Sequence, residues 1–101
     1  TAHIVFSKID SKNCVTHSKK IINDIIRKKI GFNGIIISDD IEMKSLKHDV
    51  VRNALKALSS GCNLALYCSG KYNISYKLLR KIPHIDEFTS KKTSQFYKFL
   101  R

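Results

Sequence analysis

Short apolar runs alternate with amphipathic segments along this chain. The runs from Ala2 to Phe6, Gly34 to Ser38 and Asn63 to Cys68 are rich in aliphatic residues and predict three strands. Three consecutive isoleucines, Ile35 to Ile37, predict that the second strand is buried on both faces, as in a parallel sheet. The strands begin about 30 residues apart, which is the spacing of βαβ units.

Helical signals fill the intervals between these strands. The first helix is expected to begin at Lys19, with Ser18 as its N-cap, and to close at Gly31, and its isoleucines recur on one face. Three more helices are expected from caps and apolar faces: Asp49 to Gly61, Tyr72 to Lys81, and about Ser90 to Leu100. The order βαβαβα predicts an α/β fold with parallel strands.

The segments that directly follow the three strands are expected to lie at one edge of the sheet, because parallel strands share a direction. In α/β barrels and open α/β sheets this edge carries the chemistry. Asp39 and Asp40 come directly after the isoleucine run at this edge. Asp40 could cap a short helix over residues 41–44, and a solvated strand end would explain the pair without any function. Asp39 has no obvious structural role, so it is the candidate for chemistry.

The charge of the chain is strongly basic, with 19 Lys and Arg against 8 Asp and Glu and a formal net charge of +11. The basic residues are scattered, mostly on the polar faces of the expected helices, which favours solvated surfaces over a nucleic-acid patch. Two alternatives stay open. One is a small basic α/β module that binds nucleic acid or another polyanion, which requires the lysines to converge on one face. The other is an interaction module that completes its sheet with a partner chain.

Cysteine and histidine usage gives no sign of a disulfide framework or a metal site. No pair among the three cysteines has CxxC spacing, and their odd number fits a reducing cytoplasm. His17, His48 and His84 lack metal-ligand spacing and are interpreted as surface or cap residues. No apolar stretch approaches the ~20 residues of a membrane span. The first residues do not form a signal peptide. The chain does not begin with Met, so we expect that it is a piece of something longer or has lost that residue.

The stretch from Gly31 to Met43 reads Gly-Phe-Asn-Gly-Ile-Ile-Ile-Ser-Asp-Asp-Ile-Glu-Met and resembles a signature of glycoside hydrolase family 3. That signature is Gly-Phe-Asp-Gly, an apolar strand, Ser-Asp-Asp, an apolar residue and a nearby Met. Three further segments are similar to family segments in the same order: Ala2 to Ile4, Ala57 to Leu66, and Cys68 to Lys71. The resemblance covers about residues 1–85 and leaves residues 86–101 as a C-terminal helical tail. Asn33 and Asn63 depart from it, because the family has Asp at both places.

The resemblance implies a fold, a reaction and a site. The fold would be a partial TIM (β/α)8 barrel, made of about the last three βα units. By family analogy Asp39 is the nucleophile of a retaining glycosidase, which forms a glycosyl-enzyme that water then hydrolyses. Asp40 favours the β-N-acetylhexosaminidase branch. His3 and Met43 are candidate substrate-binding residues, with a hydrogen-bonded core His and a core Met as the structural alternatives. No metal or organic cofactor is implied.

The implied substrate is a non-reducing terminal N-acetyl-β-D-glucosamine linked to an anhydro-muramic peptide, and the implied role is peptidoglycan recycling. The family's Lys-His-Phe-Pro-Gly-His-Gly segment, which carries the acid/base His, does not occur in this sequence, and neither does its Asp-Gln-Glu-Gly segment. A whole barrel takes ~250 residues, so this chain supplies about three of eight units. We therefore expect the missing N-terminal barrel portion to be a partner, and the isolated chain to be an inactive fragment.

Overall fold

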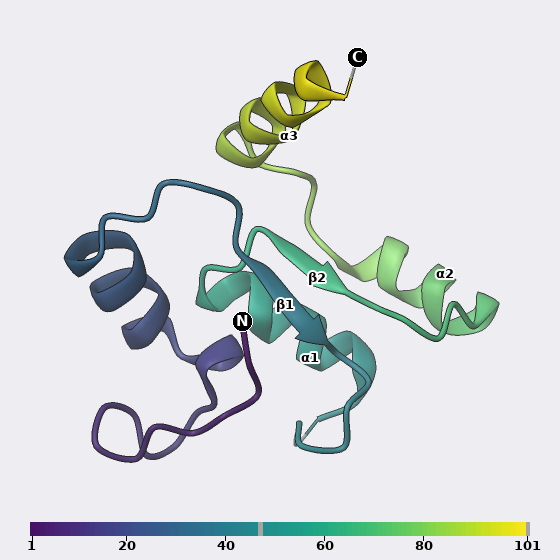
Figure 1. Ribbon diagram of the computed structural model, residues 1–101. Coiled ribbons are helices and arrows are strands. Elements are labelled where there is room, and N and C mark those ends of the chain that lie inside the picture. Colours follow the sequence, from purple (N-terminus) through teal and green to yellow (C-terminus); the bar gives the residue numbers. More distant parts are fainter. Residues whose placement is uncertain (47, 101) are drawn as a thin grey trace.

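Two short parallel strands lie at the centre of the described chain, with helices packed behind them in the view of Figure 1. The computed structural model describes residues 1–46 and 48–100. In chain order the elements are η1 (Val15–His17), η2 (Lys20–Lys29), β1 (Ile37–Asp40), α1 (Val50–Ser60), β2 (Leu64–Leu66), α2 (Tyr72–Lys81) and α3 (Glu87–Phe99). Here η1 is a single 3-10 turn and η2 is a π-helix.

The strands β1 and β2 pair in parallel, and α1 lies in the connection between them. The register pairs Ile37 with Leu64 and Asp40 with Leu66, so three steps along β1 match two steps along β2. Such a mismatch is a bulge, which bends the strand and changes the direction of its side chains. The predicted α/β fold with parallel strands is confirmed for these two strands.

The predicted helix ends follow from local hydrogen bonds and glycine conformation. The Ser18 hydroxyl accepts a hydrogen bond from the Ile21 N–H at 3.2 Å, and Gly31, just beyond η2, has a φ of 76°. The Asp49 carboxylate accepts a hydrogen bond from the Arg52 N–H at 3.0 Å at the start of α1. These bonds satisfy N–H groups that the first turn of a helix leaves without a partner. Both predicted caps are confirmed.

Two apolar clusters join the helices to the sheet, and α1 contributes to both. The buried members of the first cluster are Ile22, Ile36, Ala57 and Cys62. The buried members of the second cluster are Ile41, Ala54 and Leu78. The alanines of α1 are completely buried, because their small side chains let the helix backbone approach the strands closely. The burial of each larger aliphatic side chain contributes about 1.5–3 kcal/mol.

The first predicted strand, from Ala2 to Phe6, is wrong. The segment starts beside β1, where the Thr1 amino group donates to the Ile37 carbonyl at 2.6 Å. Its carbonyl groups then accept hydrogen bonds from the N–H groups of Val15 and Thr16, so η1 takes bonds that a neighbouring strand would use. The three strands of the prediction are therefore two in the structure.

The second predicted strand is displaced towards its carboxyl end, from residues 34–38 to Ile37–Asp40. The side chain of Asn63 occupies the earlier position, because its Oδ1 accepts a hydrogen bond from the Ile36 N–H at 2.8 Å. The prediction of burial on both faces is wrong at Ile37, which is 46% exposed. In Figure 1, α1 lies behind the sheet and no described helix crosses its front face. The third predicted strand is present but shorter, at Leu64–Leu66.

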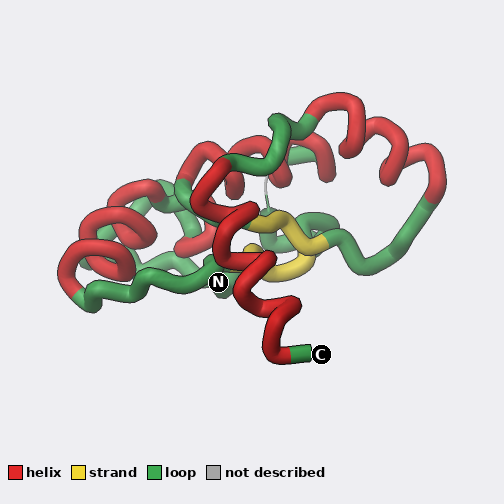
Figure 2. The backbone as a smooth tube through the Cα atoms, turned by 90° about the horizontal axis from the view of Figure 1, so that it is seen from above, coloured by secondary structure: helices red, strands yellow, loops and turns green. Residues whose placement is uncertain are grey.

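The last two helices differ in how they pack. α2 spans Tyr72–Lys81 as predicted. α3 begins at Glu87 rather than near Ser90, because the Asp86 carboxylate caps it by accepting from the Thr89 N–H at 2.7 Å. Figure 2 shows α1 and α2 on one side of the strands and α3 running away to the other side.

The described chain has an open shape, with principal extents of 42 × 35 × 20 Å. Its radius of gyration is 14.0 Å. A compact domain of 100 residues has a radius of about 13 Å. Among the described residues, no helix has both the length and the apolar character to cross a bilayer.

Gly61 is expected to be the least replaceable glycine of the fold. It closes α1 with a φ of 118°, and a Cβ atom there would lie 2.7 Å from Ile22 Cγ2. Gly70 also has a positive φ of 64°, but a Cβ atom there meets nothing within 4 Å. The left-handed conformation alone costs alanine about 1–2 kcal/mol. The clash with Ile22 adds about 1 kcal/mol or more. Urea unfolding should therefore show a larger loss for Gly61→Ala than for Gly70→Ala, and equal losses would contradict this packing.

Candidate active site at the carboxyl edge of the sheet

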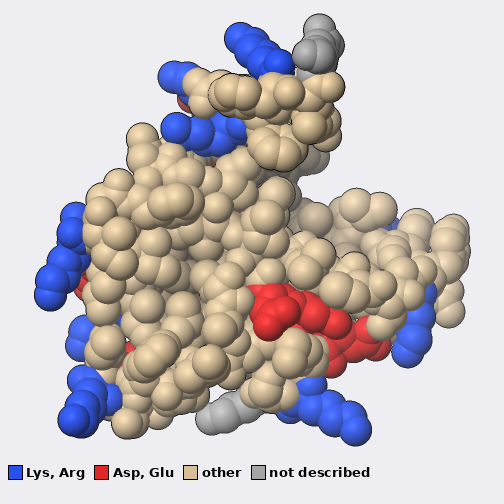
Figure 3. Space-filling view, viewed as in Figure 1, with Lys and Arg blue, Asp and Glu red and all other residues tan. Residues whose placement is uncertain are grey.

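Three carboxylates, those of Asp39, Asp40 and Glu42, gather where β1 ends. Figure 3 shows an acidic area on a face whose visible Lys and Arg side chains lie towards the periphery. Desolvation raises the pKa of the Cys68 thiol, the negative charges of all three acids raise it further, and Cys68 follows β2 in the chain. The edge expected to carry the chemistry is therefore the place where acidic side chains from β1 meet the chain that leaves β2.

Each side chain of Ser38-Asp39-Asp40 makes a hydrogen bond to the backbone. The Ser38 hydroxyl accepts from the Leu66 N–H of β2 at 2.9 Å. Asp39 Oδ1 accepts from the Asp40 N–H at 2.8 Å, and Asp40 Oδ1 accepts from the Glu42 N–H at 3.1 Å. The bulge of β1 is thus held by side chains, which fixes the backbone that carries both acids.

Asp39 lies within β1, one residue before the strand ends, and is half-buried. Its Oδ1 is used in the bond to Asp40, whereas Oδ2 makes no hydrogen bond within residues 1–46 and 48–100. A carboxylate held through one oxygen keeps the other available for chemistry. Residues 41–44 form turns rather than the short helix that Asp40 could have capped, and Asp40 accepts from the Glu42 N–H.

The chain that follows β2 is tied to the chain that follows β1. The Ser69 hydroxyl donates a hydrogen bond to Glu42, and the Lys71 ammonium lies 3.5 Å from Glu42 Oε1. Strand ends that share a direction place these loops together, as the sequence predicts for residues 39–48 and 69–71. Glu42 itself was not singled out from the sequence, since a single acid after a strand carries no distinctive spacing.

Cys68 is a second site residue that sequence reasoning missed. Desolvation of the sulfur, followed by the negative charges of Asp40, Asp39 and Glu42, raises the pKa of the Cys68 thiol. This thiol therefore stays protonated at neutral pH and is a weak hydrogen-bond donor rather than a nucleophile. The only signal in the sequence is its place directly after the third apolar run.

His3 is held by hydrogen bonds on both ring nitrogens. Its Nδ1 lies 2.9 Å from Thr16 Oγ1, and its Nε2 lies 2.8 Å from the carbonyl oxygen of Asp40. Because a carbonyl oxygen only accepts, Nε2 carries a proton and donates it. The imidazole thus ties the N-terminal segment to the end of β1, one residue beyond Asp39.

Met43 follows the Asp40 turn, and its N–H donates to the Asp40 carbonyl at 3.2 Å. The interpretation of Met43 as a core residue is wrong, because 43% of its surface is exposed. The structure therefore places Met43 beside the acids with its side chain accessible.

The histidines are not all surface or cap residues. His17 is only 7% exposed, and its Nε2 donates to the Asn53 carbonyl at 3.2 Å. Burial, and then the nearby charges of Lys56, His3 and His48, lower the pKa of His17 against the opposing effect of the Asn53 bond. Within the described part of the chain, no group of three or more His, Cys, Asp or Glu is arranged to hold a metal ion.

Removal of the Ser38 hydroxyl should weaken the bulge. Ser38→Ala leaves the Leu66 N–H without its acceptor and should lower the free energy of unfolding by about 1–2 kcal/mol. The exchange of the Leu66 amide hydrogen should accelerate in parallel. Ser59→Ala is the control, since that exposed hydroxyl only donates to the Lys56 carbonyl of its own helix. Unchanged Leu66 exchange in Ser38→Ala would show that the hydroxyl does not hold the strands.

Burial of neutral His17 should make the fold sensitive to mild acid. The pKa of an unfolded His is about 6.5, and the folded value is lower, so the unfolded chain binds more protons between the two values. The free energy of unfolding should fall as the pH drops through this window, by up to about 1.4 kcal/mol per pH unit. His17→Gln should flatten the slope measured by urea unfolding between pH 7.5 and 5.5. His84→Gln, which replaces an exposed histidine, should leave this slope unchanged. Equal slopes in both variants would contradict the role of His17 in the pH dependence.

Comparisons with known proteins place most of this chain in one family. The family described as Glycosyl hydrolase family 3 N terminal domain matches residues 1–94. A Beta-hexosaminidase of Mannheimia succiniciproducens is 35% identical over 104 residues, which are 96% of this chain and 30% of that protein. A Beta-hexosaminidase of Actinobacillus succinogenes is 33% identical over the same coverage of both chains. A Beta-hexosaminidase of Haemophilus influenzae is 36% identical over 82% of this chain and 25% of its own length.

The chain thus spans less than a third of the length of these relatives. The family match extends over nearly all of the sequence and includes the bulged strand with its Ser-Asp-Asp end. This chain belongs to glycosyl hydrolase family 3.

Proposed function

We propose that this chain supplies the nucleophile-bearing part of a retaining glycoside hydrolase, with Asp39 as the nucleophile. The observation that carries the proposal is the place of Asp39 at the bulged carboxyl end of β1, with one carboxylate oxygen bound to the backbone and the other unused. The catalytic residues of barrel enzymes lie at the carboxyl ends of the strands. Family membership supports the same reaction class.

The chemistry requires a carboxylate that stays in one place. Asp39 Oδ2 would attack the anomeric carbon, the bond to the leaving oxygen would break, and water would later release the sugar from the ester. The hydrogen bond from the Asp40 N–H to Oδ1 limits rotation of the carboxylate, and the Ser38 hydroxyl limits movement of the strand. A displacement of ~1 Å can cost about 100-fold in rate, so these bonds serve the reaction directly.

The proposed substrate is a terminal N-acetyl-β-D-glucosaminide, as in peptidoglycan recycling in the cytoplasm. The names of the relatives support the hexosaminide class, and the second acid, Asp40, favours the N-acetyl branch. Met43, exposed beside the acids, is proposed as a substrate contact. His3 is proposed to shape the same edge of the sheet, with its ring fixed by Thr16 and the Asp40 carbonyl.

A complete active site would need more chain than these 101 residues. One face of the sheet is uncovered, and Ile37 and Leu66 are exposed by 46% and 43%. We propose that the strands belong to a (β/α)8 barrel, whose interior would cover such residues. The general acid/base would then come from the missing portion, so the chain alone is proposed to be inactive.

The polyanion-binding alternative has less support. It needs basic residues that converge on one face, whereas in the view of Figure 3 the Lys and Arg side chains belong to several elements and stand apart from one another. Three of the acids, Asp39, Asp40 and Glu42, in contrast lie together around Cys68 at the sheet edge. This distribution favours a carboxylate-based site.

A chimera tests the proposal. Residues 1–94 of this chain would replace the matching segment of the Actinobacillus succinogenes Beta-hexosaminidase, and turnover of a chromogenic N-acetyl-β-D-glucosaminide would be measured. We expect the isolated 101-residue chain to give no turnover and the chimera to be active. Asp39→Asn in the chimera should lower kcat by a factor on the order of 10³ or more. The first product should keep the β configuration in proton NMR.

Asp40→Asn is the matched control, because it removes a neighbouring acid that is bound to the Glu42 N–H. We expect a loss of about tenfold there, as for a displaced positioning group. An active chimera that keeps its turnover in Asp39→Asn would refute the nucleophile. Turnover by the isolated chain that Asp39→Asn abolishes would refute the proposed incompleteness.

A further inference from the structure

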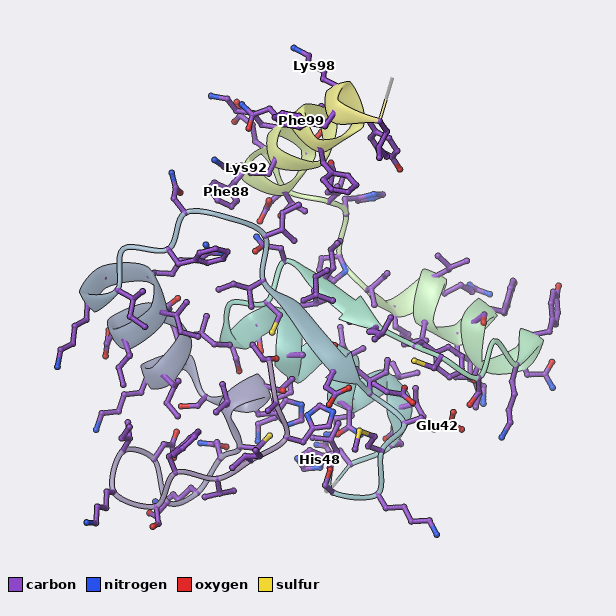
Figure 4. The ribbon with its side chains drawn as sticks, viewed as in Figure 1. Glu42, His48, Phe88, Lys92, Lys98 and Phe99 are labelled. Carbon is purple, nitrogen blue, oxygen red and sulfur yellow. The ribbon has the colours of Figure 1, made fainter. Side chains whose placement is uncertain are left out.

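A small cavity lies beside the β1–α1 loop. It has a volume of about 60 Å³ and is lined by residues from the N-terminal segment, η1, this loop and α1. Its lining includes five side chains that are basic or can become so: His3, Lys12, His17, His48 and Lys56. In Figure 4, Glu42 and His48 leave the same loop, Glu42 on the side of α2 and His48 away from it.

No described residue in the lining of this cavity carries a negative charge that could balance the positive ones. No Asp or Glu lines it in the described part of the chain. Neither Lys12 nor Lys56 forms an ion pair within residues 1–46 and 48–100. The acids on neighbouring elements are engaged elsewhere, since Asp10 accepts from Ser18 and Asn13, and Asp49 caps α1. The repulsion between like charges at the walls is therefore not offset by an ion pair within residues 1–46 and 48–100.

The effect of this field is visible on His17, which is the most buried of the five. Burial lowers the pKa of His17 most, and the charges of Lys56, His3 and His48 lower it further, so the cavity disfavours an additional positive charge. An anion would reverse this effect. A metal ion would not, because two ammonium groups face the same space.

We propose that this cavity binds one tetrahedral oxyanion of the phosphate type. One water needs roughly 10–15 Å³ of such volume, so about four water-sized groups fit, which matches four oxygen atoms. The Lys12 and Lys56 ammonium groups and the His48 ring supply donors without a partner among the described residues. His17 adds a donor at Nδ1 when it is protonated, since its Nε2 is already bound to the Asn53 carbonyl. This site is independent of the role of Asp39.

The test is a titration of the 101-residue chain with inorganic phosphate, followed by proton–nitrogen NMR at pH 6.5 and constant ionic strength. We expect saturable shifts at His17, His48 and Lys56. The loss of one charged donor should weaken binding by about tenfold in Lys56→Gln. Lys12→Gln removes an exposed ammonium at the rim and should weaken it by about 3- to 10-fold. If circular dichroism shows that Lys56→Gln is unfolded, the phosphate affinity of Lys12→Gln tests the proposal instead.

Lys77→Gln on α2 is the matched control, because it removes the same charge far along the chain from the cavity. An unchanged Kd in this variant supports the site. Equal weakening in all three variants, or shifts spread over the lysines of every helix, would mean diffuse attraction to a chain of net charge +11 and would overturn the proposal. Titration with a hexose phosphate identifies the source of the oxyanion: binding as tight as that of phosphate assigns a phosphate monoester, and weaker binding assigns the free ion.

Discussion

The Ser38 hydroxyl accepts the Leu66 N–H at the point where the parallel ladder slips by one residue. Without this bond β2 would lack a partner for that N–H, because the bulge moves the backbone carbonyl of β1 out of register. Next to this slip, the carboxylates of Asp39 and Asp40 accept from the Asp40 and Glu42 N–H groups and so hold the end of the strand. The geometry of the acidic edge thus depends on a hydroxyl group within a sheet of only two short strands.

Polar side chains, rather than a large apolar core, connect the remaining elements. Asn53 is 2% exposed and donates to the carbonyls of Ile41 and His48, so α1 holds both ends of the loop between β1 and α1. Asn63 accepts from the Ile36 N–H and from Arg27, and donates to Thr89 at the start of α3. An amide has both donors and acceptors, and the carboxylate that the family signature has at position 63 could not donate to Thr89.

The sequence predicted best what short-range physics determines. Ser18 and Asp49 as caps, Gly31 and Gly61 as left-handed ends, and the whole of α2 depend on residues within a few positions of each other. The wrong strand from Ala2 to Phe6 fails for a long-range reason, since the N–H groups of Val15 and Thr16 compete for its carbonyls.

In the candidate site, too, the sequence predicted the features that depend on neighbouring residues and missed those that depend on distant ones. The place of Asp39 at a strand end follows from the apolar run before it. The contact of Glu42 with Ser69 and Lys71 joins residues that are almost 30 positions apart, and no local pattern marks it. The burial of His17 depends on the packing of η1 against α1, which periodicity does not reveal.

The loop between β1 and α1 separates two environments of opposite charge. Glu42 on one side belongs to the acidic edge, and His48 on the other side belongs to the basic cavity (Figure 4). His3 contacts both, because its ring lines the cavity while its Nε2 donates to the Asp40 carbonyl. On each side of the loop, charges of the same sign lie near one another and repel. This repulsion is relieved only where a charge of the opposite sign lies beside them. Lys71 supplies that charge for Glu42, and an oxyanion would supply it for the lysines of the cavity.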